Sequence, residues 1–213
     1  MLLDEVGGDF YDYSLLKDGK IGIIMMDVSG HGVPSAFISA MAKLIFTREA
    51  PFCDKPSVLL ERLNRDLFGK IAENFLMVFY AILDPQQGTL EFSSAGHSPA
   101  ILFSHKDNSI TRLDVDGMLI GVLEEETYQD RLVELTENDR VFFYSDGILQ
   151  SRNDDGGGSY GETFFGEERL NKFIADNHDL ESRIFSEKLI ETLSQFCGSD
   201  TFNDDITFLI LDR

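Results

Sequence analysis

Hydrophobic and polar residues alternate at the start of the chain in a pattern typical of β-strands. Residues 9–16 (DFYDYSLL) place aromatic and aliphatic side chains between polar ones, and residues 20–28 follow with a mainly apolar run. Asp18 and Gly19, which lie between the two runs, are a common hairpin turn pair. The pattern therefore predicts an antiparallel hairpin with a half-buried first strand and a buried second strand.

Two helices are predicted after this hairpin. A glycine-rich break at residues 30–32 ends the second strand, and Pro34 stands where a first helical residue is favoured. Residues 35–48 then have helical composition, with apolar side chains on several faces. A second helix is expected to begin at Ser57, which can cap it, and to carry an apolar face as far as Ile71.

The rest of the chain alternates short apolar runs with turn residues, which is typical of antiparallel sheets. Strands are predicted at residues 75–83, 89–95, 100–103, 109–113, 128–135, 140–144 and 206–211. Residues 153–158 are expected to form a loop, and helices are expected at 167–176 and 180–196. No repeat or linker divides the sequence. The order of elements therefore predicts one α+β domain over residues 1–213, with stacked antiparallel sheets between helical layers.

The charge of the chain limits its partners. Asp and Glu number 38 against 18 Lys and Arg, which gives a net charge of −20. Because nucleic acids attract basic surfaces, this balance argues against nucleic acid as the main partner. No run of about 18 apolar residues indicates a membrane span, and the first residues lack a signal-peptide pattern. We therefore expect a cytoplasmic protein without a membrane partner. Cys53 and Cys197 have no metal-binding spacing and receive no role.

Four aspartates occupy the ends of apolar strands, which is unusual for acids on a solvated surface; they are Asp9, Asp27, Asp146 and Asp204. A carboxylate beside a buried strand loses hydration unless a positive group compensates for the loss. Strand ends that meet at one sheet edge would bring these acids together, and such a cluster is stable mainly when it holds a cation. Oxygen ligands select hard ions such as Mg²⁺ or Mn²⁺. Each aspartate alone is also a common turn residue, so the joint pattern carries the prediction.

Five motifs occur in sequence order: GGDFYDY at 7–13, DVSGHG at 27–32, SAGHSPA at 94–100, YSDGILQSRN at 144–153 and DDITFLIL at 204–211. Together they resemble the SpoIIE/RsbU-type branch of the metal-dependent (PPM, type 2C) serine/threonine protein phosphatases, over nearly the whole chain. The resemblance implies an α-β-β-α sandwich of two antiparallel sheets flanked by helices, with two Mn²⁺ or Mg²⁺ ions at one edge. It also implies hydrolysis of phosphoserine or phosphothreonine by a metal-activated water.

The resemblance assigns a role to each candidate ligand by its position in these motifs. Asp27 would bridge both ions, and Asp146 and Asp204 would complete the coordination of one of them. The backbone carbonyl of Val28 would serve the other ion. Asp9 would ligate an ion or hold a metal-bound water.

Two positions depart from the pattern of the wider family. Asp205 stands where relatives often have asparagine, so Asp204 is preferred as the ligand. Ser29 stands where eukaryotic relatives carry a histidine that is thought to act as the general acid, and His31 lies two residues further on. His31 is expected to be a helix-start residue, and His97 is expected to shape a turn by local hydrogen bonding. The group that protonates the leaving oxygen stays open.

The resemblance also implies partners. The phosphorylated substrate would be a STAS-type anti-sigma-factor antagonist, and an upstream sensor or receiver domain would precede this module in a longer signalling protein. The alternative is a catalytically silent phosphatase fold that only binds a partner or a cation; acids at all the expected positions argue against it. The GGDF string at 7–10 is also similar to the GGDEF signature of diguanylate cyclases, but the six residues before it cannot supply a nucleotide-binding portion.

Overall fold

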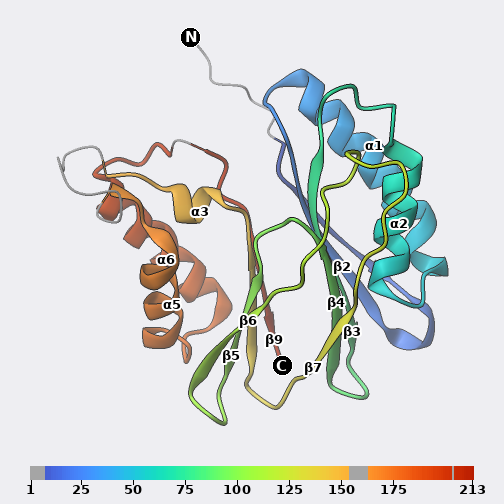
Figure 1. Ribbon diagram of the computed structural model, residues 1–213. Helices are drawn as coiled ribbons and strands as arrows, with labels where there is room; N and C mark the ends of the chain where they lie inside the picture. The colour runs from blue at the N-terminus through green and yellow to red at the C-terminus, as the bar shows by residue number, and fades with distance from the viewer. Residues whose placement is uncertain (1–7, 154–162, 203) are drawn as a thin grey trace. The chain divides into compact units, whose positions relative to one another are not determined.

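The computed structural model describes residues 8–153, 163–202 and 204–213, and its elements form two compact units. Unit 1 comprises the chain up to Pro99 together with Asp114–Leu135; unit 2 comprises Ala100–Leu113 and Thr136–Arg213. Each unit is built on one antiparallel sheet with its own helices (Figure 1). This arrangement confirms the predicted α+β class of two antiparallel sheets flanked by helices. Among the described residues, no helix is long and apolar enough to cross a membrane.

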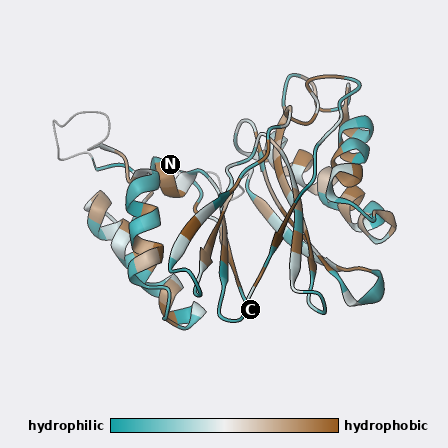
Figure 2. Ribbon diagram, turned by 60° about the horizontal axis from the view of Figure 1, so that its bottom comes forward, coloured by the Kyte–Doolittle hydropathy of each residue, from teal (hydrophilic) through white to brown (hydrophobic). Residues whose placement is uncertain are grey.

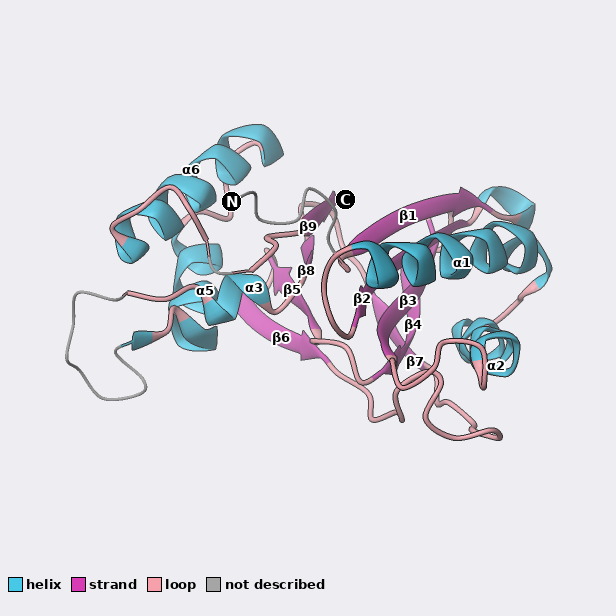
Figure 3. Ribbon diagram, turned by 90° about the horizontal axis from the view of Figure 1, so that it is seen from above, coloured by secondary structure: helices cyan, strands magenta, loops and turns pink. Residues whose placement is uncertain are grey.

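Unit 1 contains a five-stranded sheet in the order β1-β2-β3-β4-β7. Its strands are β1 (Phe10–Leu15), β2 (Ile21–Val28), β3 (Leu76–Asp84), β4 (Thr89–Ala95) and β7 (Arg131–Glu134). Helices α1 (Val33–Glu49) and α2 (Pro56–Leu67) pack beside each other over this sheet (Figure 3). The short 3-10 turns η1 (Lys17–Gly19) and η2 (Ala50–Phe52) follow β1 and α1. The predicted hairpin of the first two strands is confirmed.

Alternation along β2 decides which of its residues face the helices. Ile24, Met26 and Val28 belong to one buried core with Leu59 of α2. Since successive strand side chains point to opposite faces of a sheet, Asp27 faces away from that core. The candidate bridging aspartate therefore lies on the sheet face opposite α1 and α2.

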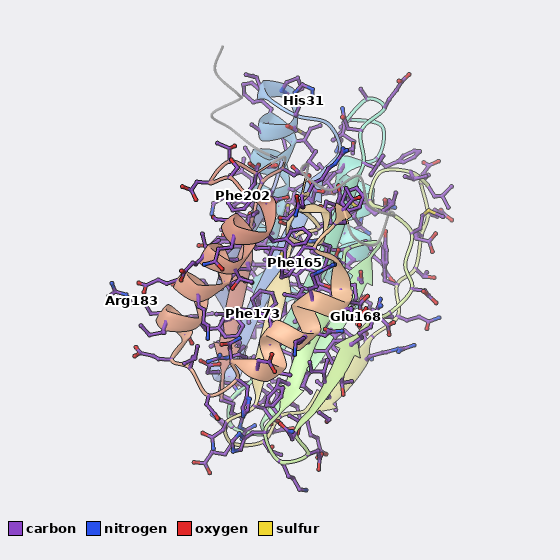
Figure 4. All side chains as sticks on the ribbon, turned by 90° about the vertical axis from the view of Figure 1, so that its left-hand side faces the viewer. His31, Phe165, Glu168, Phe173, Arg183 and Phe202 are labelled. Carbon is purple, nitrogen blue, oxygen red and sulfur yellow. The ribbon has the colours of Figure 1, made fainter. Side chains whose placement is uncertain are left out.

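Unit 2 contains a four-stranded sheet in the order β6-β5-β8-β9. Its elements are β5 (Ala100–Ser104), β6 (Ser109–Leu113), β8 (Arg140–Tyr144), α3 (Gly147–Gln150), α5 (Gly166–Asp176), α6 (Ser182–Cys197) and β9 (Phe208–Asp212). Apolar residues concentrate on the strands and on the sides of the helices that face them (Figure 2). Phe165 and Phe173 are buried in this core, whereas Glu168 and Arg183 point outward (Figure 4).

Helix α2 differs from the sequence expectation at both ends. It begins at Pro56 and ends at Leu67, so Ile71 lies beyond it. The prediction that Ser57 caps this helix is wrong: its backbone N–H and its hydroxyl each donate to the Asp130 carboxylate at 2.7 Å. Pro56 fits the first helical position because that position has no use for a backbone N–H.

The chain around β9 also differs from expectation. The strand expected at 206–211 begins only at Phe208, and the short helix α3 was not expected. Ser145 N–H donates to the Thr207 carbonyl at 2.9 Å, and Thr207 N–H donates to the Ser145 hydroxyl at 3.1 Å. The Ser145 hydroxyl thus takes the place of a backbone carbonyl as the acceptor for Thr207, and the regular hydrogen-bond ladder between β8 and β9 ends there. The loop expected at 153–158 lies, from residue 154 on, outside the described residues.

The SAGHSPA segment forms the turn between β4 and β5. His97 N–H donates to the Ser94 hydroxyl at 3.2 Å, and His97 Nδ1 lies 2.9 Å from the Ser98 carbonyl oxygen. Gly96 has a φ of +73°, and the Leu119 side chain lies 2.3 Å from where a Cβ would stand. Both features require glycine there. The local, turn-shaping role predicted for His97 is confirmed.

Because of His97, the free energy of unfolding should decrease as the pH is lowered. Burial lowers the pKa of this imidazole to about 4, from an ordinary value of 6.5. Between these values the unfolded chain binds a proton that the folded protein excludes, so the contribution of neutral His97 is present above pH 6.5 and is lost as the pH falls toward 4. We expect this group to account for about 2 kcal/mol of lost unfolding free energy between pH 7 and pH 5. Urea unfolding at both pH values should show that His97→Gln reduces this loss by that amount; an unchanged pH dependence would contradict the assignment.

Gly22 and Tyr80 give a test of packing in unit 1. A Cβ at position 22 would lie 2.4 Å from the Tyr80 hydroxyl, which is buried and has no hydrogen-bond partner among the described residues. Gly22→Ala should therefore destabilise the fold by about 1–3 kcal/mol through overpacking. Tyr80→Phe removes an unsatisfied polar group, so it should be neutral or stabilising and should rescue Gly22→Ala. Urea unfolding of the four proteins measures the rescue, and strictly additive effects would refute the contact.

Candidate metal centre

The first group of candidate ligands lies where β1 begins and β2 ends. Phe10 pairs with Met26 in antiparallel register. Continuing that register by one residue sets Asp9 opposite Asp27, on the sheet face that points away from α1 and α2. Directly opposed residues on antiparallel strands have Cβ atoms about 4.5–5.5 Å apart. The two carboxylates are therefore within reach of one shared cation.

Gly8 allows the backbone to approach the end of β2 closely. A Cβ at this position would lie 2.6 Å from the Val28 carbonyl oxygen and 3.2 Å from Asp27 Oδ1. Ser39 of α1 holds the glycine in place, because its hydroxyl donates to the Gly8 carbonyl at 2.9 Å. Any larger residue would have to displace backbone or ligand atoms. Gly8 thus keeps the Val28 carbonyl and the Asp27 carboxylate beside the segment that carries Asp9.

The DVSGHG motif forms a tight loop between β2 and α1. Gly30 and Gly32 have φ values of +89° and +75°, which glycine adopts without steric cost. The Ser29 hydroxyl accepts the Phe75 N–H at 2.9 Å, so it closes the base of the loop. His31 is exposed beside the start of α1 (Figure 4). The expected place of His31 at a helix start is confirmed.

The second group of candidate ligands lies in unit 2, where β8 passes into α3 and where the chain enters β9. A Cβ at Gly147 would lie 2.1 Å from the Asp205 carbonyl oxygen and 3.5 Å from the Asp204 Cβ. The Ser145 hydroxyl donates to the same Asp205 carbonyl at 3.3 Å. The two segments are therefore in direct contact, and Asp146 lies beside Asp204.

Like charge accumulates in this second group. Burial and, second, the neighbouring Asp204 carboxylate raise the pKa of Asp146. Gln150 of α3 donates to Asp146 Oδ2, and the Asp205 N–H donates to Asp204 Oδ1 at 2.8 Å, so both carboxylates are oriented. A divalent cation would remove the repulsion, since an opposite charge favours the ionised form of both acids.

The candidate ligands thus form two sets, one in each unit: Asp9, Asp27 and the Val28 carbonyl in unit 1, and Asp146 with Asp204 in unit 2. All of their donor atoms are oxygens, which fits Mg²⁺ or Mn²⁺. Sequence reasoning did not single out Gly8 and Gly147 as site residues. Their signal was a glycine adjacent in sequence to a candidate aspartate, which also has an ordinary turn interpretation.

Comparison with known proteins agrees with these features. The family model described as Stage II sporulation protein E (SpoIIE) matches residues 17–213. The chain is 26% identical over 210 residues to phosphoserine phosphatase RsbU and 26% identical over 215 residues to phosphoserine phosphatase RsbP, both of Bacillus subtilis (strain 168). Each alignment covers 98% of this chain, but only 60% of RsbU and 49% of RsbP. The chain therefore spans about half of RsbP and 60% of RsbU.

The structure is also similar to a solved one. It matches the SiaA-PP2C domain of Pseudomonas aeruginosa with a TM-score of 0.81 and 25% sequence identity, covering 98% of this chain and 81% of that chain. The fold and the order of the motifs therefore lead to the same group of proteins. Because the family model covers nearly all of the sequence, the chain belongs to the SpoIIE family, in the SpoIIE/RsbU branch of the metal-dependent type 2C phosphatases.

Proposed function

We propose that this chain is a metal-dependent phosphatase that hydrolyses phosphoserine or phosphothreonine on another protein, with two Mn²⁺ or Mg²⁺ ions as cofactors. The observation that carries the proposal is the forced proximity of acids: Asp146 stands beside Asp204 with a raised pKa, and Asp9 stands opposite Asp27. Such pairs are stable mainly when cations compensate them. The relatives RsbU and RsbP are named phosphoserine phosphatases, which supports the choice of reaction.

Each candidate ligand has a distinct part in this proposal. Asp27 would bridge both ions, and Asp146 and Asp204 would complete the coordination of one of them. The Val28 carbonyl would serve the other ion, and Asp9 would ligate an ion directly or through a water. Two such ions, when bound, lower the pKa of a water and neutralise the phosphate oxygens.

The backbone around these ligands is closely packed. Gly8 lies against the Val28 carbonyl and Gly147 lies against the Asp205 carbonyl, so a larger residue at either position would have to displace backbone atoms. Such a displacement would matter because shifts of about 1 Å cost catalysis heavily. Ser29, which stands at the position of the eukaryotic histidine, uses its hydroxyl to close the loop after β2.

The substrate that fits this reading best is a STAS-type anti-sigma-factor antagonist that carries phosphoserine. The motif resemblance to the SpoIIE/RsbU branch supports this choice, and RsbU and RsbP are similar over 98% of this chain. Such a pathway operates in the cytoplasm, where thiols stay reduced.

An upstream sensor or receiver domain is proposed as the regulatory partner. The relatives are longer than this chain, which leaves room for such a domain. Helix α1 offers a surface to it: Val33, Phe37 and Leu44 are 63%, 68% and 70% exposed. These residues fall within one narrow stripe of an α-helix with 3.6 residues per turn. Exposed apolar stripes of this kind mark interaction surfaces.

Replacing the bridging ligand tests the metal assignment. Asp27→Asn should abolish Mn²⁺-dependent hydrolysis of p-nitrophenyl phosphate and weaken Mn²⁺ binding in calorimetry, because both ions lose a ligand. The melting temperature without metal should not fall. Asp12→Asn is the matched control: Asp12 lies on the neighbouring strand, on the face toward α1, and pairs with Lys43 at 2.8 Å. Unchanged Mn²⁺ binding in Asp27→Asn would overturn the bridging role, and no hydrolysis by the wild type would favour a silent phosphatase fold.

The adjacent acids before β9 give a second test. Asp204 raises the pKa of Asp146, whereas the Asp205 contacts in this region use its backbone. Asp204→Asn should therefore lose most activity, and Asp205→Asn should keep a substantial part of it. Steady-state rates at saturating Mn²⁺ decide the order. If Asp205→Asn instead lost more activity than Asp204→Asn, Asp205 would be the metal ligand and the assignment of Asp204 would be wrong.

A further inference from the structure

A second cluster of ligand-type side chains lies in unit 2, at the opposite end of β8 from Asp146. His105 directly follows β5, and His178 and Asp179 lie in the turn between α5 and α6. One ligand atom from each residue lies within 4.8 Å of the other two. We propose that these three residues form a binding site for a transition-metal ion, with Zn²⁺ as the preferred metal.

His178 is already oriented for coordination. Its Nδ1 lies 2.8 Å from the Ala175 carbonyl oxygen, and its Nε2 lies 3.0 Å from Asp179 Oδ1. The ring stacks on Phe103 with centroids 4.4 Å apart and an interplanar angle of 25°. Metal-binding histidines usually donate their other ring N–H to a carbonyl or carboxylate, which fixes the ring and the tautomer. The Nδ1–H bond to Ala175 does this, so Nε2 is the coordinating atom.

His105 is held by a buried carboxylate. Its backbone N–H donates to Asp139 Oδ1 at 2.9 Å. Asp139 is only 2% exposed and also accepts the Thr136 N–H at 2.7 Å and the Thr136 hydroxyl at 3.0 Å. The backbone of His105 is therefore fixed, while its exposed ring lies 5.8 Å from the His178 ring.

The surroundings can accept a further positive charge. The cluster lines a shallow pocket with Arg140, Glu181, Asp212 and Arg213. Arg140 is balanced by Asp212, to which it donates at 2.6 and 3.0 Å, and it lies over the Phe185 ring at 4.7 Å. Helix α5 also ends here, and the C-terminal end of a helix favours cations.

The donor set selects the metal. Two imidazole nitrogens and one carboxylate oxygen suit Zn²⁺, whereas Mg²⁺ and Mn²⁺ prefer oxygen ligands alone. Tetrahedral Zn²⁺ with bonds of about 2.0–2.1 Å needs ligand atoms about 3.3 Å apart, so the exposed His105 and Asp179 side chains must close by a small rotation. Three protein ligands leave one position for water. The ion would tie the α5–α6 turn to the β5–β6 hairpin and would stabilise unit 2.

A Zn²⁺ titration tests this site separately from the aspartate groups. The full chain is titrated with Zn²⁺ by calorimetry in excess Mg²⁺, which occupies sites made of oxygen ligands. We expect one Zn²⁺ per chain, and we expect His105→Ala and Asp179→Asn each to weaken its binding by at least about tenfold. Asp107→Asn is the matched control. It removes the same charge as Asp179→Asn and lies in the β5–β6 turn beside His105, but it removes no proposed ligand. This variant should bind Zn²⁺ like the wild type.

Co²⁺ absorption provides a second measurement, because tetrahedral coordination with histidine gives a visible band that oxygen ligation does not match. The band should appear in the wild type and disappear in His105→Ala, which leaves the stacking of His178 on Phe103 intact. Equal Zn²⁺ affinity of His105→Ala and the wild type would overturn the proposal, as would absence of Zn²⁺ binding by the wild type. In that case the contact between His178 and Asp179 is an ordinary solvent-exposed polar contact.

Discussion

In each unit, backbone contacts bring candidate metal-ligating carboxylates close together, and the proposed chemistry depends on this proximity. The register of β1 and β2 sets Asp9 opposite Asp27. The contact between the α3 start and the segment before β9 sets Asp146 beside Asp204, and burial and that neighbour raise the Asp146 pKa. A bound divalent cation would compensate the negative charge of both arrangements. In a protein with a net charge of −20, bound divalent ions would also supply the positive charge that attracts a phosphate group.

Two glycines make these arrangements possible. Gly8 brings the segment before β1 against the Val28 carbonyl, and Gly147 brings the start of α3 against the Asp205 carbonyl. In each unit the glycine directly adjoins a candidate aspartate in the chain. The close contact of each glycine with a backbone carbonyl therefore positions the neighbouring aspartate. It also leaves no room for a larger side chain at the glycine. Hydroxyls of Ser39 and Ser145 secure these contacts by donating to backbone carbonyls.

Local patterns in the sequence predicted much of the fold. The alternation in residues 9–16 and the apolar run in 20–28 gave the β1–β2 hairpin, because strand periodicity directly reflects which face is buried. What local patterns could not supply was pairing over long distances. Ser57 looks like a helix cap, but its partner is Asp130, 73 residues away. Helix α3 has only four residues, which is too short to show helical periodicity.

The candidate site, like the fold, was predicted only in part from the sequence. The position of four aspartates at strand ends identified the candidate ligands, and the motif resemblance assigned their roles. The parts of Gly8 and Gly147 depend on contacts that only coordinates reveal. The exposed His105 and the partly buried His178 lie far apart in the sequence and belong to no motif, so nothing in the sequence suggested that they meet. A site whose residues form a sequence motif can be predicted from the sequence. A site whose residues come from loops of different elements cannot.

The most direct test of the central claim is anomalous diffraction from crystals of this chain grown with Mn²⁺, because it locates the ions without relying on activity. The account predicts two Mn²⁺ peaks about 4 Å apart, with Asp27 within ligand distance of both and with Asp146 and Asp204 contacting one of them. A single peak, or a pair of peaks that Asp27 does not bridge, would contradict it.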